Sequence, residues 1–78
     1  MTSADFRAAI EEILELPPDS LQDSDSRDSI PTWTSLADVK IVTFVASEFG
    51  VEPDPELMEA QTFGELVKAL EEKRLISA

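Results

Sequence analysis

The sequence WTSLADVKIVTFVASEFG, residues 33–50, carries the strongest structural pattern in the chain. Its apolar residues recur at intervals of three and four, which places them along one side of an α-helix; they are Leu36, Val39, Val42, Val45, Ala46 and Phe49. Pro31 disfavours helix at Ile30, and Gly50 is typical of the position just after a helix. We therefore expect a helix over 35–49, with this stripe facing the core and Ser35 in its first turn.

The same helix has an outer face with one unusual residue. A core direction through Val42, Ala46 and Phe49 leaves Phe44 pointing mostly outward, with Ile41 on the flank. An exposed Phe is a candidate partner contact, because aromatic residues anchor interfaces. The alternative is that Phe44 lies partly under the long loop or the third helix.

Three further helices are predicted around this one. The first spans about 3–15, is capped by Thr2 or Ser3 and ends before Pro17. A short helix over about 55–60 follows Asp54 as its cap, with Leu57 and Met58 inward, and a last helix covers 62–75. The expected fold is all-α, a small four-helix bundle in a single domain over residues 1–78, with a long first loop and a short third helix.

The long connection, residues 17–34, is rich in Ser, Asp and Pro. Leu21 and Ile30 are its expected anchors in the core.

Residues 23–28, DSDSRD, begin like a calcium-binding loop. However, Arg27, Asp28 and Thr34 occupy the positions of a ligand, the glycine and the bidentate glutamate. We therefore predict no metal site.

Residues 33–51 resemble the acyl and peptidyl carrier proteins, which bear a 4′-phosphopantetheine arm. That family has Asp-Ser-Leu at the start of its second helix, often after Trp, and Phe-Gly-Val or Phe-Gly-Ile at its end; this chain has Trp33-Thr34-Ser35-Leu36 and Phe49-Gly50-Val51. Thr34 replaces the usual Asp. The tripeptide Asp19-Ser20-Leu21 also matches the motif, but it follows two prolines and opens no amphipathic helix.

The resemblance implies a stand-alone carrier of acyl-carrier type. Ser35 is then the attachment site of 4′-phosphopantetheine, transferred from coenzyme A by a phosphopantetheinyl transferase. The arm carries acyl or aminoacyl groups as thioesters, and the partners are acyl- or aminoacyl-loading and condensing enzymes. In this interpretation Met58 borders an acyl pocket, and the partners recognise Trp33, Thr34, Leu36, Asp38 and Phe44.

Composition narrows the classes of partner. The 78 residues include 17 acids and 6 bases, a net charge of −11, which disfavours nucleic acid and anionic membranes and favours basic protein surfaces. No cysteine is present and no apolar run approaches the roughly 20 residues of a membrane span. We expect a cytoplasmic monomer.

Catalysis by the chain itself is not expected. It has no histidine or cysteine, and Ser35 has no candidate general base, so we predict a substrate of enzymes with no catalytic residues. One alternative is a helical adaptor of carrier fold that is not phosphopantetheinylated and acts only through protein–protein contacts. The other is a small acidic hydrolase, which would need converging carboxylates in a pocket.

Overall fold

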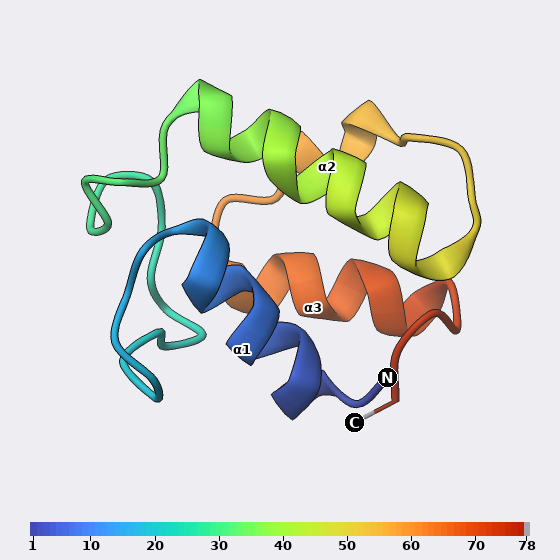
Figure 1. Cartoon of the computed structure of the whole chain (residues 1–78), viewed down its shortest axis with the longest axis horizontal. Helices are drawn as coiled ribbons and strands as arrows, with labels where there is room; N and C mark the ends of the chain where they lie inside the picture. Colours follow the sequence, from blue (N-terminus) through green and yellow to red (C-terminus); the bar gives the residue numbers. More distant parts are fainter. Residues whose placement is uncertain (78) are drawn as a thin grey trace.

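The computed structural model describes residues 1–77, and this part of the chain is helical. It contains three α-helices, α1 (Ser3–Ile13), α2 (Ser35–Phe49) and α3 (Phe63–Glu72), and a five-residue 3-10 helix, η1 (Pro55–Glu59). Figure 1 shows α2 lying across α1 and α3, with the long loop at one end of the helices. The all-α prediction is confirmed, and the predicted short third helix is the 3-10 segment. None of the helices in residues 1–77 is both long and apolar enough to cross a membrane.

The helix ends follow the expected capping chemistry. Thr2 and Thr62 each accept a hydrogen bond from a first-turn backbone N–H and complete capping boxes with Asp5 and Glu65. Gly50 ends α2 in the left-handed conformation, with φ 64°. These short-range patterns depend on neighbouring residues, which is why the sequence predicts them well.

Helix α1 is shorter than predicted and ends at Ile13, four residues before Pro17. The Leu16 N–H donates to the Glu11 carbonyl at 2.8 Å, and Glu15 takes a left-handed φ of 58°. This is the hydrogen-bond pattern that commonly closes a helix, formed here without glycine. The predicted boundary at residue 15 therefore moves back to Ile13.

Three phenylalanines join the three α-helices. The Phe6 ring of α1 lies 5.9 Å from the Phe63 ring of α3 and 6.2 Å from the Phe44 ring of α2, centroid to centroid. Phe6 and Phe63 are fully buried, whereas Phe44 is half-buried and packs against this core. Phe44 is therefore not the outward-pointing residue that the helical pattern suggested, because its ring packs on Phe6 of α1.

The buried side of α2 is rotated relative to the prediction. Ala37, Ile41 and Val45 face the core, together with Val42, while Leu36 and Val39 are exposed by 64% and 54%. Because α2 is apolar around most of its circumference, residue spacing alone does not select one side. The contact between Phe44 and Phe6 and the burial of Asp38 select it instead.

The long loop is held by apolar anchors and by backbone hydrogen bonds. Leu21 and Ile30 are buried, as predicted. The carbonyls of Asp23 and Asp25 accept the N–H groups of Gly64 and Phe63, at 2.9 Å each. The loop therefore satisfies first-turn donors of α3 that would otherwise need water.

Three side chains lie differently from expectation. Glu11 is charged, and glutamate is normally exposed, but it is buried and its Oε2 accepts the Leu21 N–H at 3.0 Å. Met58 was expected inside, but it is 37% exposed, because a 3-10 turn directs only Leu57 into the core. Residues near a chain end are often poorly packed, but Ile76 is buried, since the Ser3 N–H donates to the Ser77 carbonyl at 2.7 Å.

Candidate functional site

Ser35 is the first residue of α2 and its side chain is exposed. Thr34 is the N-cap, and its Oγ1 accepts the Ala37 N–H at 3.3 Å. Within residues 1–77, no hydrogen bond uses the N–H of Ser35 or of Leu36. The hydroxyl therefore stands beside free backbone donors at the positive end of a helix dipole, which is a favourable environment for a phosphate group.

Thr34 caps α2 at the position where the carrier proteins that the sequence resembles have Asp. Its hydroxyl occupies the acceptor position at the N-cap, and the side chain remains exposed. The replacement therefore preserves the start of the helix and removes one negative charge next to Ser35.

Trp33 and Asp38, both predicted to contact partners, are instead internal. Trp33 is 3% exposed and Asp38 is 7% exposed. The Trp33 Nε1–H donates to Asp38 Oδ1 at 2.8 Å. Because their polar atoms bond each other inside the protein, these two side chains do not lie on the exposed surface around Ser35.

Arg27, which is partly exposed, pairs with these two residues, and the sequence interpretation missed it. Its guanidinium donates to both oxygens of Asp38, from Nη2 to Oδ1 at 2.8 Å and from Nε to Oδ2 at 2.9 Å. It also lies over the Trp33 ring, 5.0 Å from the centroid. The available signal was a single base in an acidic loop, in a chain with few bases.

The same guanidinium reaches a third segment. Arg27 Nη1 donates to the Ala60 carbonyl at 2.7 Å, and Nη2 donates to the Met58 carbonyl at 3.0 Å. We call Arg27, Trp33 and Asp38, with these two carbonyls, the Arg27 network. It joins the long loop, the first turns of α2 and the end of η1.

Exposed apolar side chains lie beside the serine. Leu36 follows Ser35 directly, and Val39 lies one turn further on the same side of α2. Met58 is also exposed, and its carbonyl shares the Arg27 guanidinium with Asp38. Of the predicted recognition residues, Thr34 and Leu36 are therefore accessible, whereas Trp33, Asp38 and Phe44 are not fully so.

The second matching tripeptide has a different environment. Ser20 belongs to no helix, and its Oγ donates to the Pro17 carbonyl at 2.6 Å. Asp19, before it, has a left-handed φ of 62°. The hydroxyl of Ser20 is thus engaged in a local turn and has no helix N-terminus behind it.

A pocket of about 270 Å³ lies between α2, η1 and α3. Its apolar lining includes Val45, Leu57 and Leu70. Asp54 lies at its edge, where the Glu56 N–H and the Lys73 ammonium, 3.2 Å away, lower the pKa of the carboxyl. Glu52 and Lys73 also line it, so the pocket combines apolar and charged side chains, and it lies toward the end of α2 remote from Ser35.

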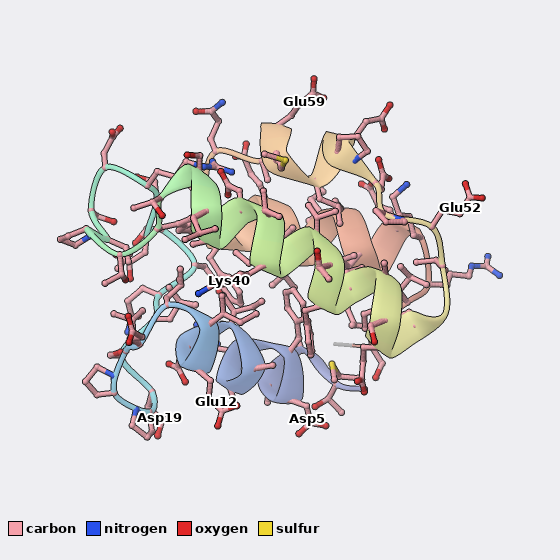
Figure 2. All side chains as sticks on the ribbon, turned by 45° about the horizontal axis from the view of Figure 1, so that its top comes forward. Asp5, Glu12, Asp19, Lys40, Glu52 and Glu59 are labelled. Carbon is pink, nitrogen blue, oxygen red and sulfur yellow. The ribbon has the colours of Figure 1, made fainter. Side chains whose placement is uncertain are left out.

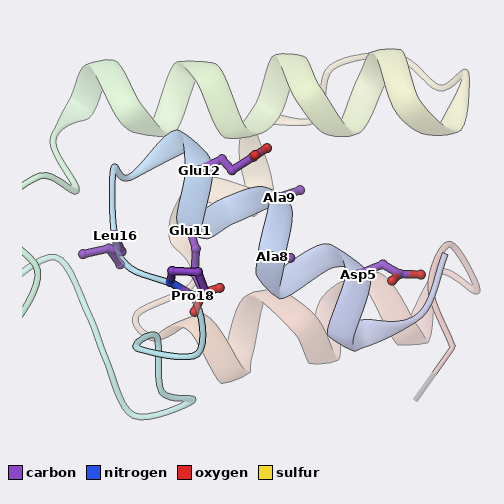
Figure 3. A pocket seen from close by; sticks show the side chains of 7 residues that line it. All are labelled: Asp5, Ala8, Ala9, Glu11, Glu12, Leu16 and Pro18. Carbon is purple, nitrogen blue, oxygen red and sulfur yellow. The ribbon is translucent and has the colours of Figure 1, made fainter.

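A larger hollow of about 360 Å³ follows the outer side of α1. Figure 3 shows Asp5 and Glu12 on different turns of α1, with Glu11 pointing away from both, near Pro18. The Glu11 carboxylate already accepts the Leu21 N–H. These side chains therefore do not converge on one point, as a pair of catalytic carboxylates would.

The acids of the calcium-like segment serve the loop itself. Asp25 accepts hydrogen bonds from the Gln22 N–H and the Ser29 hydroxyl. Asp23 pairs with Arg7 at 2.6 Å. Other acids extend from the molecule in several directions, as Figure 2 shows for Asp5, Glu12, Asp19, Glu52 and Glu59.

Comparison of the chain with protein-family models, curated proteins and solved structures finds no match.

Proposed function

We propose that this protein is a stand-alone carrier that bears a 4′-phosphopantetheine arm on Ser35 and moves acyl or aminoacyl groups between biosynthetic enzymes. In this proposal the three α-helices and η1 correspond to the small four-helix bundle of the acyl and peptidyl carriers, with η1 as the short third helix. The chain itself is not an enzyme, and it meets its partners as a cytoplasmic monomer.

The exposed serine at the start of α2 is the observation that carries the proposal. Ser35 stands at the N-terminus of a 15-residue helix whose core face is packed and whose end is closed by Gly50. A rigid helix presents the hydroxyl in one orientation, which a modifying enzyme requires.

The residues around Ser35 fit the proposed group. The Ser35 Oγ would attack the β-phosphate of coenzyme A and form a phosphodiester with phosphopantetheine, its proton passing to a base of the transferase. The pyrophosphate bond of coenzyme A would break, and adenosine 3′,5′-bisphosphate would leave. The free N–H groups of Ser35 and Leu36 would then face the new phosphate charge, which the helix dipole also stabilises. When attached, the arm supplies a thiol that holds cargo as a thioester.

The partner surface differs from the predicted set. Leu36, Val39 and Met58 are exposed apolar side chains, and Thr34 lies beside Ser35. A phosphopantetheinyl transferase, and the loading and condensing enzymes, would bind this surface through apolar contact. The net charge of −11 favours partners with basic residues around the contact.

The apolar pocket between α2, η1 and α3 suits the tail of a small acyl group. Its volume of about 270 Å³ and its lining by Val45, Leu57 and Leu70 admit a short hydrocarbon chain.

The experiment is incubation with a broad-specificity phosphopantetheinyl transferase, coenzyme A and Mg²⁺, followed by intact mass measurement. We expect the wild-type protein to gain the mass of one phosphopantetheine. Ser35→Ala should abolish the gain, and Ser20→Ala, the matched control in the second tripeptide, should keep it.

Failure of the wild-type protein to gain mass, while a known carrier is loaded in the same mixture, would contradict the proposal. It would favour the alternative adaptor, which would use the Leu36 and Val39 surface without any arm. A gain that survives Ser35→Ala would move the site to another hydroxyl.

A further inference from the structure

We propose that Arg27 and Asp38 are positioning residues that fix the orientation of Ser35 for modification. The inference rests on the proposed function and assigns a role to the Arg27 network, whose side chains belong neither to the partner surface nor to the pocket. Among residues 1–77, Asp38 is one of two buried charged side chains, and it lies three residues from Ser35 in sequence; Arg27, its partner, is partly exposed.

The network closes a ring of bonds around the start of α2. Trp33 immediately precedes the N-cap, and Asp38 is the fourth residue of the helix. In many helices an apolar pair at these two positions sets the angle at which the chain enters the helix. Here the 2.8 Å bond from Trp33 Nε1 to Asp38 Oδ1 takes that place, and Ser35 lies in the segment between the two bonded residues.

Arg27 makes this bond possible. Asp38 is 7% exposed, and a buried carboxylate without a counter-ion is strongly disfavoured. The guanidinium neutralises it with two hydrogen bonds and covers the Trp33 ring. Without Arg27, the Asp38 carboxylate would be stable only where water can hydrate it. Its movement toward solvent would displace the first turn of α2.

The network also links Ser35 to η1. Because Arg27 holds the carbonyls of Met58 and Ala60, the end of η1 and the first turn of α2 share one cation. A change that moves η1 would therefore alter the orientation of Ser35, because Arg27 also bonds Asp38, which bonds Trp33.

The test compares Arg27 variants in steady-state loading by a phosphopantetheinyl transferase. We expect Arg27→Met to lower kcat by roughly tenfold or more, because small misplacements of a reacting group have effects of that size. The KM should change less, since Thr34 and Leu36 are retained for contact. Arg27→Lys keeps the charge but loses the two-pronged bond, and should recover part of the rate.

Arg7→Met is a matched control. Arg7 also ties the loop to the helices, pairing with Asp23 and lying 5.0 Å from the Phe63 ring centroid. Its loss should lower the free energy of unfolding. The kcat should remain unchanged once it is divided by the folded fraction, which circular dichroism measures. A purely structural role for Arg27 would make the two variants behave alike.

A second variant keeps the test valid if Arg27→Met folds poorly. The double change Arg27→Met with Asp38→Asn removes both charges, and the Asn oxygen can still accept the Trp33 N–H. We expect it to fold and to load more slowly than wild type. The fluorescence of Trp33, the single tryptophan of the chain, should shift in Arg27→Met and remain closer to wild type in the double variant.

The outcomes separate the two proposals. A wild-type protein that is never loaded refutes the proposed function, and the positioning role falls with it. If the wild-type protein is loaded, and the Arg27→Met and double variants fold and are loaded with the kcat of wild type, only the positioning role is refuted.

Discussion

Gly64 shows how one missing side chain lets the long loop lie against α3. Its N–H donates to the Asp23 carbonyl at 2.9 Å. A Cβ built at Gly64 would lie 3.1 Å from both the Cβ and the carbonyl oxygen of Asp23. Asp23 is itself held by Arg7, so it has little freedom to withdraw.

Gly64→Ala is therefore expected to destabilise the protein. In an ordinary helix the change would add about 1 kcal/mol of stability. Here we expect the free energy of unfolding to fall by about 1 kcal/mol, because the loop must move from the helix. Urea unfolding measures it, with Ser47→Ala on the exposed side of α2 as the control. A Gly64→Ala protein more stable than wild type would show that the loop yields freely.

Single residues differ in how well the sequence predicts them. Caps such as Thr2, Thr62 and Gly50 depend on partners within a few positions, and the structure confirms them. Asp38 depends on Arg27, which precedes it by eleven residues in an irregular loop. No periodic pattern connects these two, and Asp38 was assigned to the surface for that reason.

Helix α2 illustrates the same limit at the level of an element. Its start and end agree with the prediction, because Pro31, Thr34 and Gly50 are local signals. Its rotation does not agree, because the spacing of apolar residues fits more than one side. The contact of Phe44 with Phe6 that selects the true side is a property of the assembled helices.

The N-cap of α2 gives a prediction at this scale. Thr34→Ala removes the acceptor for the Ala37 N–H and should lower the free energy of unfolding by about 1 kcal/mol. Thr34→Asp should retain the cap and gain from the helix dipole. Chemical unfolding measures both, and equal stability of the Ala and Asp variants would contradict the capping role. The Asp variant should also be loaded faster if the transferase recognises the family's usual residue.

The charge of the whole molecule is high for its size. The net charge of −11 is carried on a body of 28 × 23 × 18 Å. Three of the six bases, Arg7, Arg27 and Lys73, form ion pairs with acids. The remaining carboxylates repel one another across the surface.

Salt should therefore stabilise the protein. The Debye length falls from ~30 Å at 0.01 M salt to ~8 Å at 0.15 M, that is, from more than the longest dimension of 28 Å to a fraction of it. We expect the Tm to rise over this range in thermal unfolding followed by circular dichroism. A variant with Glu12→Gln, Glu52→Gln and Glu59→Gln should show a smaller rise. A Tm that is constant or falls with salt would mean that surface repulsion is unimportant.

The pairing of the two ends has a consequence for connectivity. Thr2 and Ser77 form a parallel bridge, and the Ser77 N–H donates to the Met1 carbonyl at 3.2 Å; Figure 1 shows the first residues and the segment after α3 side by side. A few linking residues would convert this chain into a ring without stretching any helix. The ring could then be cut at the exposed turn near Ser20, giving a circular permutant in which the helices follow one another in a new order.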